Sequence, residues 1–329
     1  MSYKNSIILL SLSLIITAVL SLAVGQVSLS ISQTVEGLLA SDESSLSIIV
    51  QELRLPRALL GLMVGAALGV SGAALQGVLR NPLADPGIIG VSASAALGAV
   101  IAIHLGLVAS TAFALPIFAM AGAISATLII LYLASRDSSI LMIILVGIGI
   151  SSLATAAISL VMNLAENPMT LRDMIMWMMG SLENRTIDDL KLATPLIALG
   201  WLIMMGSGSG LNALSVGEDV AQTMGINIKQ LKLRIVLGSA ISVGAAVAVC
   251  GSIGFVGLVV PHIVRGLITK EPGKLLVPSA LLGALLLTLA DMVTRLPSDG
   301  TTLRLGVVTA LIGAPAFLYI IYKTRESMR

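Results

Sequence analysis

The chain has 329 residues, of which 57% are hydrophobic and only 11% are charged, and its formal net charge is +2. A soluble domain carries about 25% charged residues, so this composition predicts an all-α membrane protein and gives no indication of a nucleic-acid partner. One cysteine excludes an internal disulfide, and two histidines leave no cluster of metal ligands.

The first apolar stretch runs for 18 residues from Ile7 to Val24 and follows Lys4. Its end, Leu22 to Gly25, loosely resembles a signal-peptide cleavage site. We interpret the stretch as an uncleaved first membrane helix, because it is long for a signal core and many further spans follow.

The second span begins after Arg54 and Arg57, and its 22 uncharged residues from Ala58 to Leu79 can cross a bilayer core of about 30 Å. Small residues recur along it at every fourth position, which predicts a flat face for close helix packing. They are Gly61, Gly65, Gly69, Ala73 and Gly77. The loop Asn81–Pro86 then turns the chain, and we expect it to cap helix ends.

Apolar runs of helical length predict about ten spans in a single transmembrane domain, residues 1–329. They are Ile7–Val24, Ala58–Leu79, Ile88–Leu107, Phe113–Leu133, Leu141–Leu164, Leu192–Met205, Ile235–Val249, Ile253–Ile268, Leu275–Ala290 and Leu305–Ile321. An even number places both termini on one side. That side holds twelve of the 19 lysines and arginines, so the positive-inside rule predicts cytoplasmic termini.

Apart from Arg265, the predicted spans contain no Asp, Glu, Lys or Arg. Proton relays place such residues at membrane depth despite a cost of about 2.5–3.5 kcal/mol each, so a proton-coupled carrier is disfavoured. The chain also lacks a G-x-x-x-x-G-K-[ST] phosphate loop. Uphill transport would therefore draw its energy from another polypeptide; a secondary transporter or channel acting alone is the alternative.

A polar stretch after the sixth span, Leu214–Gly225, predicts a short helix. Ser215 and Glu218 have the spacing of a capping box, and Gly225 is a suitable C-terminal stop. One face of that helix would carry Val216, Val220 and Met224. Such an apolar ridge fits either a groove on a partner or the surface of its own protein.

Five segments in the same order resemble the FecCD-type permeases, the membrane subunits of ATP-binding-cassette (ABC) importers for ferric siderophores, haem and vitamin B12. They are Arg54–Gly90, Ser215–Gly225, Gly251–Arg265, Ala290–Arg295 and Gly306–Pro315. The resemblance covers nearly the whole chain.

This resemblance implies a type II importer in the bacterial inner membrane. Its membrane part would consist of this ten-span permease and a second permease, identical or paralogous. Two cytoplasmic ATPases and a periplasmic binding protein would complete the importer. ATP and Mg²⁺ would be used by the ATPases, and the permease itself would have no catalytic residue, metal or bound cofactor. The expected cargo is a ferric siderophore, with haem or cobalamin as alternatives.

The resemblance also implies roles for individual residues. A coupling segment at about residues 211–228 would sit in the ATPase through Leu214, Ser215, Gly217, Glu218, Ala221, Met224 and Gly225. Three arginines would dock the binding protein, and their alternative role is to anchor helix ends at the lipid headgroups. They are Arg54, Arg57 and Arg295.

Arg304 marks a departure from the family pattern. The family commonly has Glu-Leu-Pro before the last span, whereas this chain has Thr302-Leu303-Arg304. The change removes an acid and adds a cation, so Arg304 would join the docking set or meet an anionic cargo.

Hydroxyl and amide side chains mark a possible gate and pathway around the fifth span. Ser138 and Ser139 resemble the location of the family's cytoplasmic gate, or they belong to an ordinary loop. The polar residues that would line the pathway, or instead hydrogen-bond between helices, are Ser151, Ser152, Thr155 and Asn163.

Overall fold

The fold is known from a computed structural model, which describes residues 2–25, 27–41, 44–111, 113–136, 139–296 and 303–327. All regular elements in these ranges are helical, and a long helix occupies each of the ten predicted spans. These are α1 (Tyr3–Ala23), α4 (Leu55–Val78), α5 (Val91–His104), α6 (Ala114–Arg136), α7 (Ile140–Asn163), α9 (Ile187–Met204), α12 (Ile228–Cys250), α13 (Val256–Leu267), α14 (Pro272–Thr294) and α15 (Leu305–Ser327).

Short helices connect or flank the long ones. They are α2 (Ile31–Leu39), α3 (Ser45–Ser47), the π-helix η1 (Ile48–Arg54), the 3₁₀ turns η2 (Pro86–Ile89) and η3 (Leu107–Ala109), α8 (Pro168–Met178), α10 (Gly208–Val216) and α11 (Glu218–Thr223). Asn81 and Asp85 fix the loop before η2, because their side-chain oxygens accept from the amides of Leu83 (2.9 Å) and Gly87 (2.8 Å). The expected turn-forming role of Asn81–Pro86 is thus confirmed.

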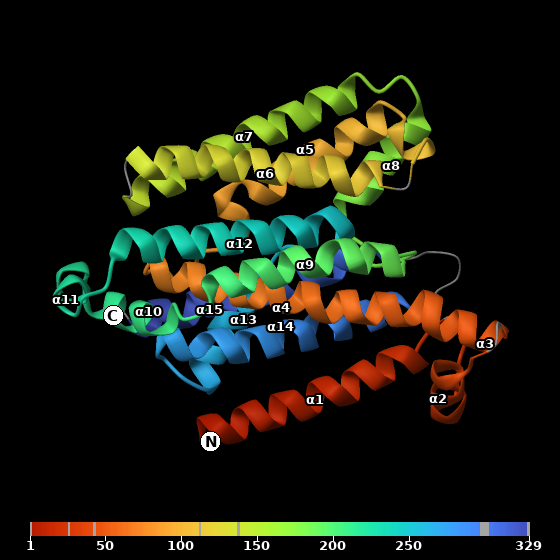
Figure 1. Ribbon diagram of the computed structural model, residues 1–329, viewed down its shortest axis with the longest axis horizontal. Helices are drawn as coiled ribbons and strands as arrows, with labels where there is room; N and C mark the ends of the chain where they lie inside the picture. The colour runs from red at the N-terminus through yellow and green to blue at the C-terminus, as the bar shows by residue number, and fades with distance from the viewer. Residues whose placement is uncertain are drawn as a thin grey trace.

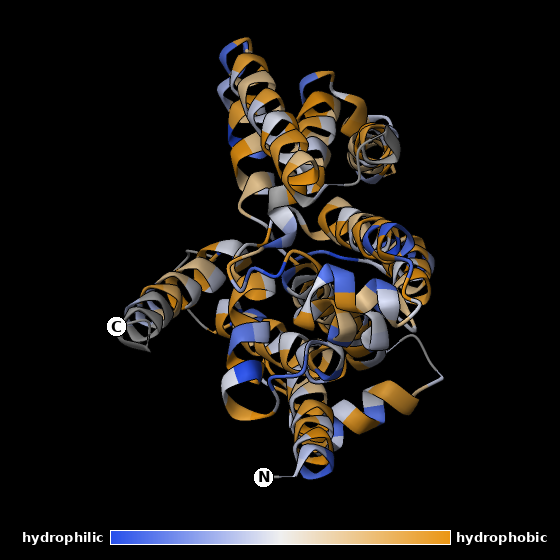
Figure 2. Cartoon of the chain, turned by 90° about the vertical axis from the view of Figure 1, so that its left-hand side faces the viewer, coloured by the Kyte–Doolittle hydropathy of each residue, from blue (hydrophilic) through white to orange (hydrophobic). Residues whose placement is uncertain are grey.

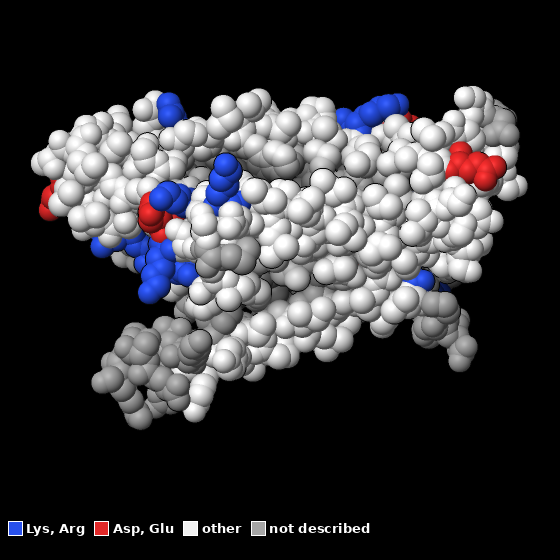
Figure 3. Space-filling view, turned by 90° about the horizontal axis from the view of Figure 1, so that it is seen from below, with Lys and Arg blue, Asp and Glu red and all other residues white. Residues whose placement is uncertain are grey.

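The helices have the length and composition of membrane spans. Within the described ranges, six helices are long and apolar enough to cross a bilayer, and a seventh span results if α9 and α10, bent by 49°, count as one. Three shorter apolar helices, α5, α13 and the first part of α15, occupy the other predicted positions. Figure 3 shows charged side chains towards the two ends of one face and none across its middle, and apolar residues cover the helices in Figure 2.

Helix α4 lies at the centre and is packed through its small residues. A methyl group added to Gly65 would lie 2.4 Å from the carbonyl oxygen of Gly283 in α14, and one on Gly69 would lie 2.1 Å from that of Ser279. The backbones of α4 and α14 therefore touch, as the repeat of small residues predicts. Gly72, which is not part of that repeat, lies equally close to α13: a methyl group on it would lie 1.9 Å from the carbonyl oxygen of Gly257.

The remaining helices pack on both sides of this centre (Figure 1). Helices α9 and α12 cover α4, and the buried hydroxyls of Ser71 and Ser242 join α4 to α12 at 3.2 Å. Helices α5 to α8 form a further group that contacts α12, whereas α1 lies along α14. The marks for both chain ends lie at the end of the bundle that carries α11, in agreement with an even number of spans.

Several helices extend beyond the predicted spans. Helix α9 begins at Ile187, because Thr186 and Asp189 form a capping box, and α12 begins at Ile228 after its cap Asn227. Some charged residues that lie beyond the ends of the predicted apolar runs are therefore part of the helices. The most important are Arg57 in α4, Asp291 in α14 and Lys232 in α12, and each of them is paired.

Candidate functional site

The predicted docking arginines gather at one end of the bundle, which we call the arginine end. Two of them bind the last carbonyls of α1: Arg54 donates from Nη1 to Leu22 (2.8 Å) and Ala23 (2.7 Å). Arg295 donates from Nη1 to the carbonyl of Ser21 at 2.7 Å. Since the last carbonyls of a helix have no partner within it, these arginines cap α1 from α14 and the start of α4.

Asp291 holds the other arginine contacts together. Arg57 donates to its Oδ1 from Nε (3.0 Å) and Nη2 (2.8 Å), and Arg295 donates to Oδ2 from Nε (2.8 Å) and also from Nη2. The Asp291 side chain is 1% exposed, Arg295 4% and Arg57 18%. One buried carboxylate therefore serves two guanidinium groups, and the group keeps a net positive charge. We call Arg54, Arg57, Asp291 and Arg295 the arginine cluster.

This placement changes the interpretation of the docking set. Arg54 and Arg295 are buried, so neither offers a free guanidinium at the surface. Only Arg57 of the cluster keeps partial exposure, and it lines a cavity of about 250 Å³ with the other two arginines. Arg304 lies beside this cavity, half-buried, and donates to Glu183 at 3.1 Å. In the isolated chain Arg54, Arg57 and Arg295 are thus engaged within the protein, and their role in docking a binding protein stays a prediction.

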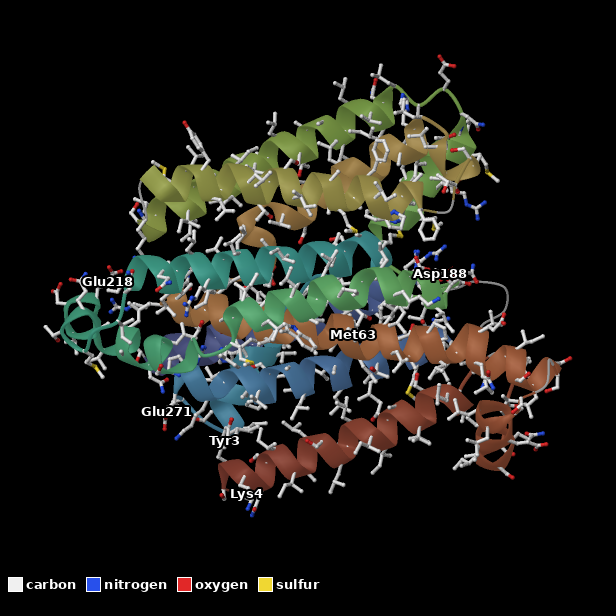
Figure 4. All side chains as sticks on the ribbon, in the orientation of Figure 1. Tyr3, Lys4, Met63, Asp188, Glu218 and Glu271 are labelled. Carbon is white, nitrogen blue, oxygen red and sulfur yellow. The ribbon has the colours of Figure 1, made fainter. Side chains whose placement is uncertain are left out.

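The predicted coupling segment lies at the opposite end of the bundle (Figures 1 and 4). It consists of two helices, α10 and α11, separated by Gly217 with φ +152°, a value that disfavours any residue with a side chain. Leu214 and Ala221 are buried and anchor the two helices, and Asn212 accepts from the amide of Gly273 (2.7 Å), which ties α10 to α14.

The capping-box prediction is wrong. Ser215 lies inside α10, where its hydroxyl donates to the carbonyl of Asn212 at 2.7 Å, and α11 begins at Gly217 without a side-chain cap. The glycine break splits the expected single helix in two, which removes the spacing on which the box depends. The predicted stop is confirmed: α11 ends at Met224, and Gly225 follows with φ +80°.

The apolar ridge of Val216, Val220 and Met224 is exposed, although the break at Gly217 places Val216 on α10 and the other two on or directly after α11. The exposed fractions are 69%, 42% and 64%, respectively. Of the two readings of this stretch, a helix that covers its own surface is disfavoured, because the ridge points away from the chain. Three neighbouring large apolar side chains at the end of a membrane bundle are typical of a protein-binding surface.

Glu218 begins α11 and is paired with a buried lysine. Its Oε1 accepts from Lys232 Nζ at 3.0 Å, and the exposed fractions of the two side chains are 40% and 8%. Lys232 belongs to the first turns of α12, so the pair fastens the α11 segment to a long spanning helix. Figure 4 shows Glu218 at the end of the bundle opposite Asp188. The sequence offered no indication of this partner beyond the presence of a lysine fourteen residues later.

The predicted gate and pathway residues lie on or before α7. Ser138 is outside the described residues, and Ser139 caps α7 by accepting from the amide of Met142 (3.2 Å). On α7 itself the structure places Ser152, Thr155 and Asn163 in exposed positions and Ser151 in a half-buried one. Thr155 donates to the carbonyl of Ser151 at 2.8 Å, so its hydroxyl is satisfied within the helix.

No group of three or more His, Cys, Asp or Glu side chains that could hold a metal ion occurs among the described residues. Ion pairs occur at both ends, and they engage Asp291 and Glu183 at one and Glu218 at the other. The molecule thus presents two separate sites, an arginine-rich end with cavities and an end with an exposed apolar ridge.

Comparison with known proteins identifies relatives of the whole chain. Residues 13–323 match the model of the FecCD transport family. A hemin transport system permease of Yersinia pestis is 39% identical over 284 residues, which cover 83% of each chain. An Fe(3+)-citrate import system permease of Bacillus subtilis is 36% identical over 318 residues, 96% of this chain and 94% of that one. An inward-facing structure of a metal-chelate type ABC transporter superposes with a TM-score of 0.86 at 33% identity, over 97% of this chain and 99% of that chain.

Proposed function

The chain belongs to the FecCD transport family, and we propose that it forms the path by which a ferric siderophore or similar iron chelate crosses the bacterial inner membrane. It is a multi-pass permease subunit of an ABC importer. Such a subunit is not an enzyme, and the ATP is used by its ATPase partner.

The observation that carries the proposal is the pair of unlike ends. At one end the ridge of Val216, Val220 and Met224 is exposed on two short helices, and at the other end cationic side chains surround cavities. The first end suits the groove of an ATPase, and the second suits acidic residues of a binding protein. The α11 end, with both termini, would then be cytoplasmic, and the arginine end periplasmic.

The α11 segment would transmit the movement of the ATPase through Glu218 and Lys232. Because Lys232 is almost fully buried, it cannot exchange Glu218 for water without a large desolvation cost. A displacement of α11 is therefore expected to move α12 with it. Met224, Val220 and Val216 would fill the ATPase groove, while Leu214, Ala221 and the turns at Gly217 and Gly225 fix the shape of the segment.

A second permease subunit would complete the pathway. Helix α7 exposes Ser152, Thr155 and Asn163, and α15 stands away from the bundle (Figure 2) with Leu311 and Leu318 exposed. The exposed sides of these two apolar or weakly polar helices suit a twofold interface across which cargo could pass. Ser139, at the start of α7, would lie near the cytoplasmic exit.

Charge reversal tests the coupling role. In a reconstituted importer containing the ATPase and the binding protein, Glu218→Lys and Lys232→Glu should each reduce ATP-dependent uptake at least about tenfold, because each leaves like charges together at a partly buried site. The double variant restores the pair and should recover much of the uptake. As a matched control, reversal of the exposed pair Lys274–Glu271 (2.9 Å) should leave uptake near the wild-type rate.

If the single reversals leave uptake and ATPase association intact, the coupling role is wrong. Uptake by the permease without any ATPase would instead support a transporter that acts alone. The cargo is tested separately, by comparing uptake of ferric citrate, a ferric siderophore, haem and cobalamin by the wild-type complex. Haem is the second candidate, since the permease of Yersinia pestis that is 39% identical belongs to a hemin transport system.

A further inference from the structure

A second cavity at the arginine end has a wall held rigid by backbone contacts. It has a volume of about 420 Å³ and lies between the end of α8, the loop 180–185, the end of α12 and Arg304. The amide of Ser181 donates to the carbonyl of Cys250 at 2.7 Å, and the amides of Leu305 and Gly306 donate to Gly180 (3.1 Å) and Met179 (3.0 Å). These bonds tie three separate segments together around the cavity, which we call the Arg185–Arg304 pocket.

The conformation of the loop shows that the pocket is built into the fold. Gly180 and Asn184 both have positive φ, +70° and +57°, and a methyl group on Gly180 would lie 2.6 Å from the carbonyl of Ser252. Glu183 is fixed in turn, because its amide donates to the hydroxyl of Ser181 at 3.0 Å. The loop therefore presents Arg185 to the pocket without large rearrangement.

Three nitrogen donors around this pocket lack an acceptor. Nε1 of Trp177, Nε of Arg185 and Nε of Arg304 are buried and have no hydrogen-bond partner among the described residues. All three residues line the pocket. Each buried donor left unpaired costs about 1–3 kcal/mol, so three in one pocket indicate an acceptor that binds there.

The acidic residues nearby do not meet this need. Glu183 accepts from Nη1 of Arg304 at 3.1 Å and leaves its Nε free, and Asp189 lies 4.0 Å from Nη1 of Arg185, beyond hydrogen-bonding distance. A ligand with several oxygens and negative charge would satisfy the remaining donors. A carboxylate matches best, since its two oxygens fit the planar fork of an arginine.

The volume indicates a small molecule as the source of that carboxylate. About 420 Å³ is within the range of small-molecule sites and is many times the volume of one water. Trp177 and Cys250, 9% and 1% exposed, are the most buried residues of its lining.

We propose that the Arg185–Arg304 pocket binds a carboxylate group of the transported molecule at the mouth of the pathway. The proposal rests on the importer function given above and narrows its cargo to carboxylate-bearing chelates. Arg304 is the specificity-determining residue, because its guanidinium adds donors to those that Arg185 brings to the same pocket.

Citrate is a suitable probe because it carries three carboxylates. The permease–ATPase complex would be placed in nanodiscs of phosphatidylcholine, without ATP or Mg²⁺, and binding of radiolabelled citrate measured against chloride of equal ionic strength. Wild-type complex should bind saturably. Arg304→Gln and Arg185→Gln should each weaken binding at least about tenfold, whereas Arg172→Gln, on the exposed face of α8, should not change it.

Absence of saturable citrate binding by the wild-type complex, or equal binding by all three variants, would overturn the proposal. ATP hydrolysis stimulated by the binding protein is measured on the same samples. If stimulation is normal and citrate does not bind, the pocket assignment fails while the importer function stands. If stimulation is absent in the wild type, the importer function itself fails.

Discussion

Replacing Asp291 by alanine should destabilise the protein more than any other single change in the arginine cluster. The substitution leaves Arg295, 4% exposed, and Arg57, 18% exposed, without their shared carboxylate. Removing one partner of a buried ion pair costs about 3–5 kcal/mol. The lower end applies here, about 3 kcal/mol, because Arg57 reaches solvent and Arg295 keeps its bond to the carbonyl of Ser21.

The single cysteine provides the assay. Cys250 is 1% exposed, so a thiol-reactive fluorescent dye reports its exposure as the detergent-solubilised permease unfolds on heating. Asp291→Ala should lower the unfolding midpoint most, Asp291→Asn less because the amide oxygen still accepts one bond, and Arg57→Gln least. Glu271→Ala, which breaks an exposed pair, is the control and should melt like wild type. A wild-type midpoint for Asp291→Ala would refute the reasoning, since it would mean that the two guanidinium groups are well solvated without the carboxylate.

Three further predictions concern packing, turn geometry and pH. Gly72→Ala should lower the unfolding midpoint strongly, because its methyl group would lie 1.9 Å from a carbonyl oxygen of α13, whereas Gly149→Ala, with open space, should not. Gly217→Ala should abolish ATPase binding while leaving the midpoint nearly unchanged, since the strain at φ +152° is confined to the α10–α11 turn; retained binding would contradict this. Burial raises the pKa of Asp85, and the amide of Gly87 lowers it less. Above the unfolded pKa of about 3.9, the ionised carboxylate therefore destabilises the folded state. Asp85→Asn should raise the unfolding midpoint at pH 7, and the difference in midpoint from wild type should vanish as the pH falls towards 4.

Local sequence patterns predicted the helices well. Each of the ten apolar runs coincides with a helix, because runs of 14 to 24 mostly apolar residues leave the chain few alternatives in a bilayer. The pattern left open whether Val216, Val220 and Met224 would face a partner or their own protein, and the structure leaves them exposed. The prediction of the helices depends only on residues within a few turns of one another.

Pairing between distant residues could not be predicted in this way. Arg57 meets Asp291 across 234 positions, so nothing in the neighbourhood of either residue shows that the arginine is already engaged. The Asp291–Arg295 spacing of four was visible within one motif, and it was the available indication that these arginines face an acid inside the protein. The capping box failed for another reason, since Gly217 lies between its two members and breaks the helix at φ +152°.

The contacts of α1 have a consequence for the order in which the molecule is made. Its last carbonyls are bound by Arg54 and, 274 residues after Ser21, by Arg295. At about 5–20 residues per second, the second arginine is synthesised roughly 14–55 s later. Until then water at the membrane surface must hydrate the carbonyl of Ser21, and Arg54 holds the end of α1 through the other two carbonyls. The end of the first helix is therefore fastened in two stages, and a chain cut short before α14 ends would lack the second attachment.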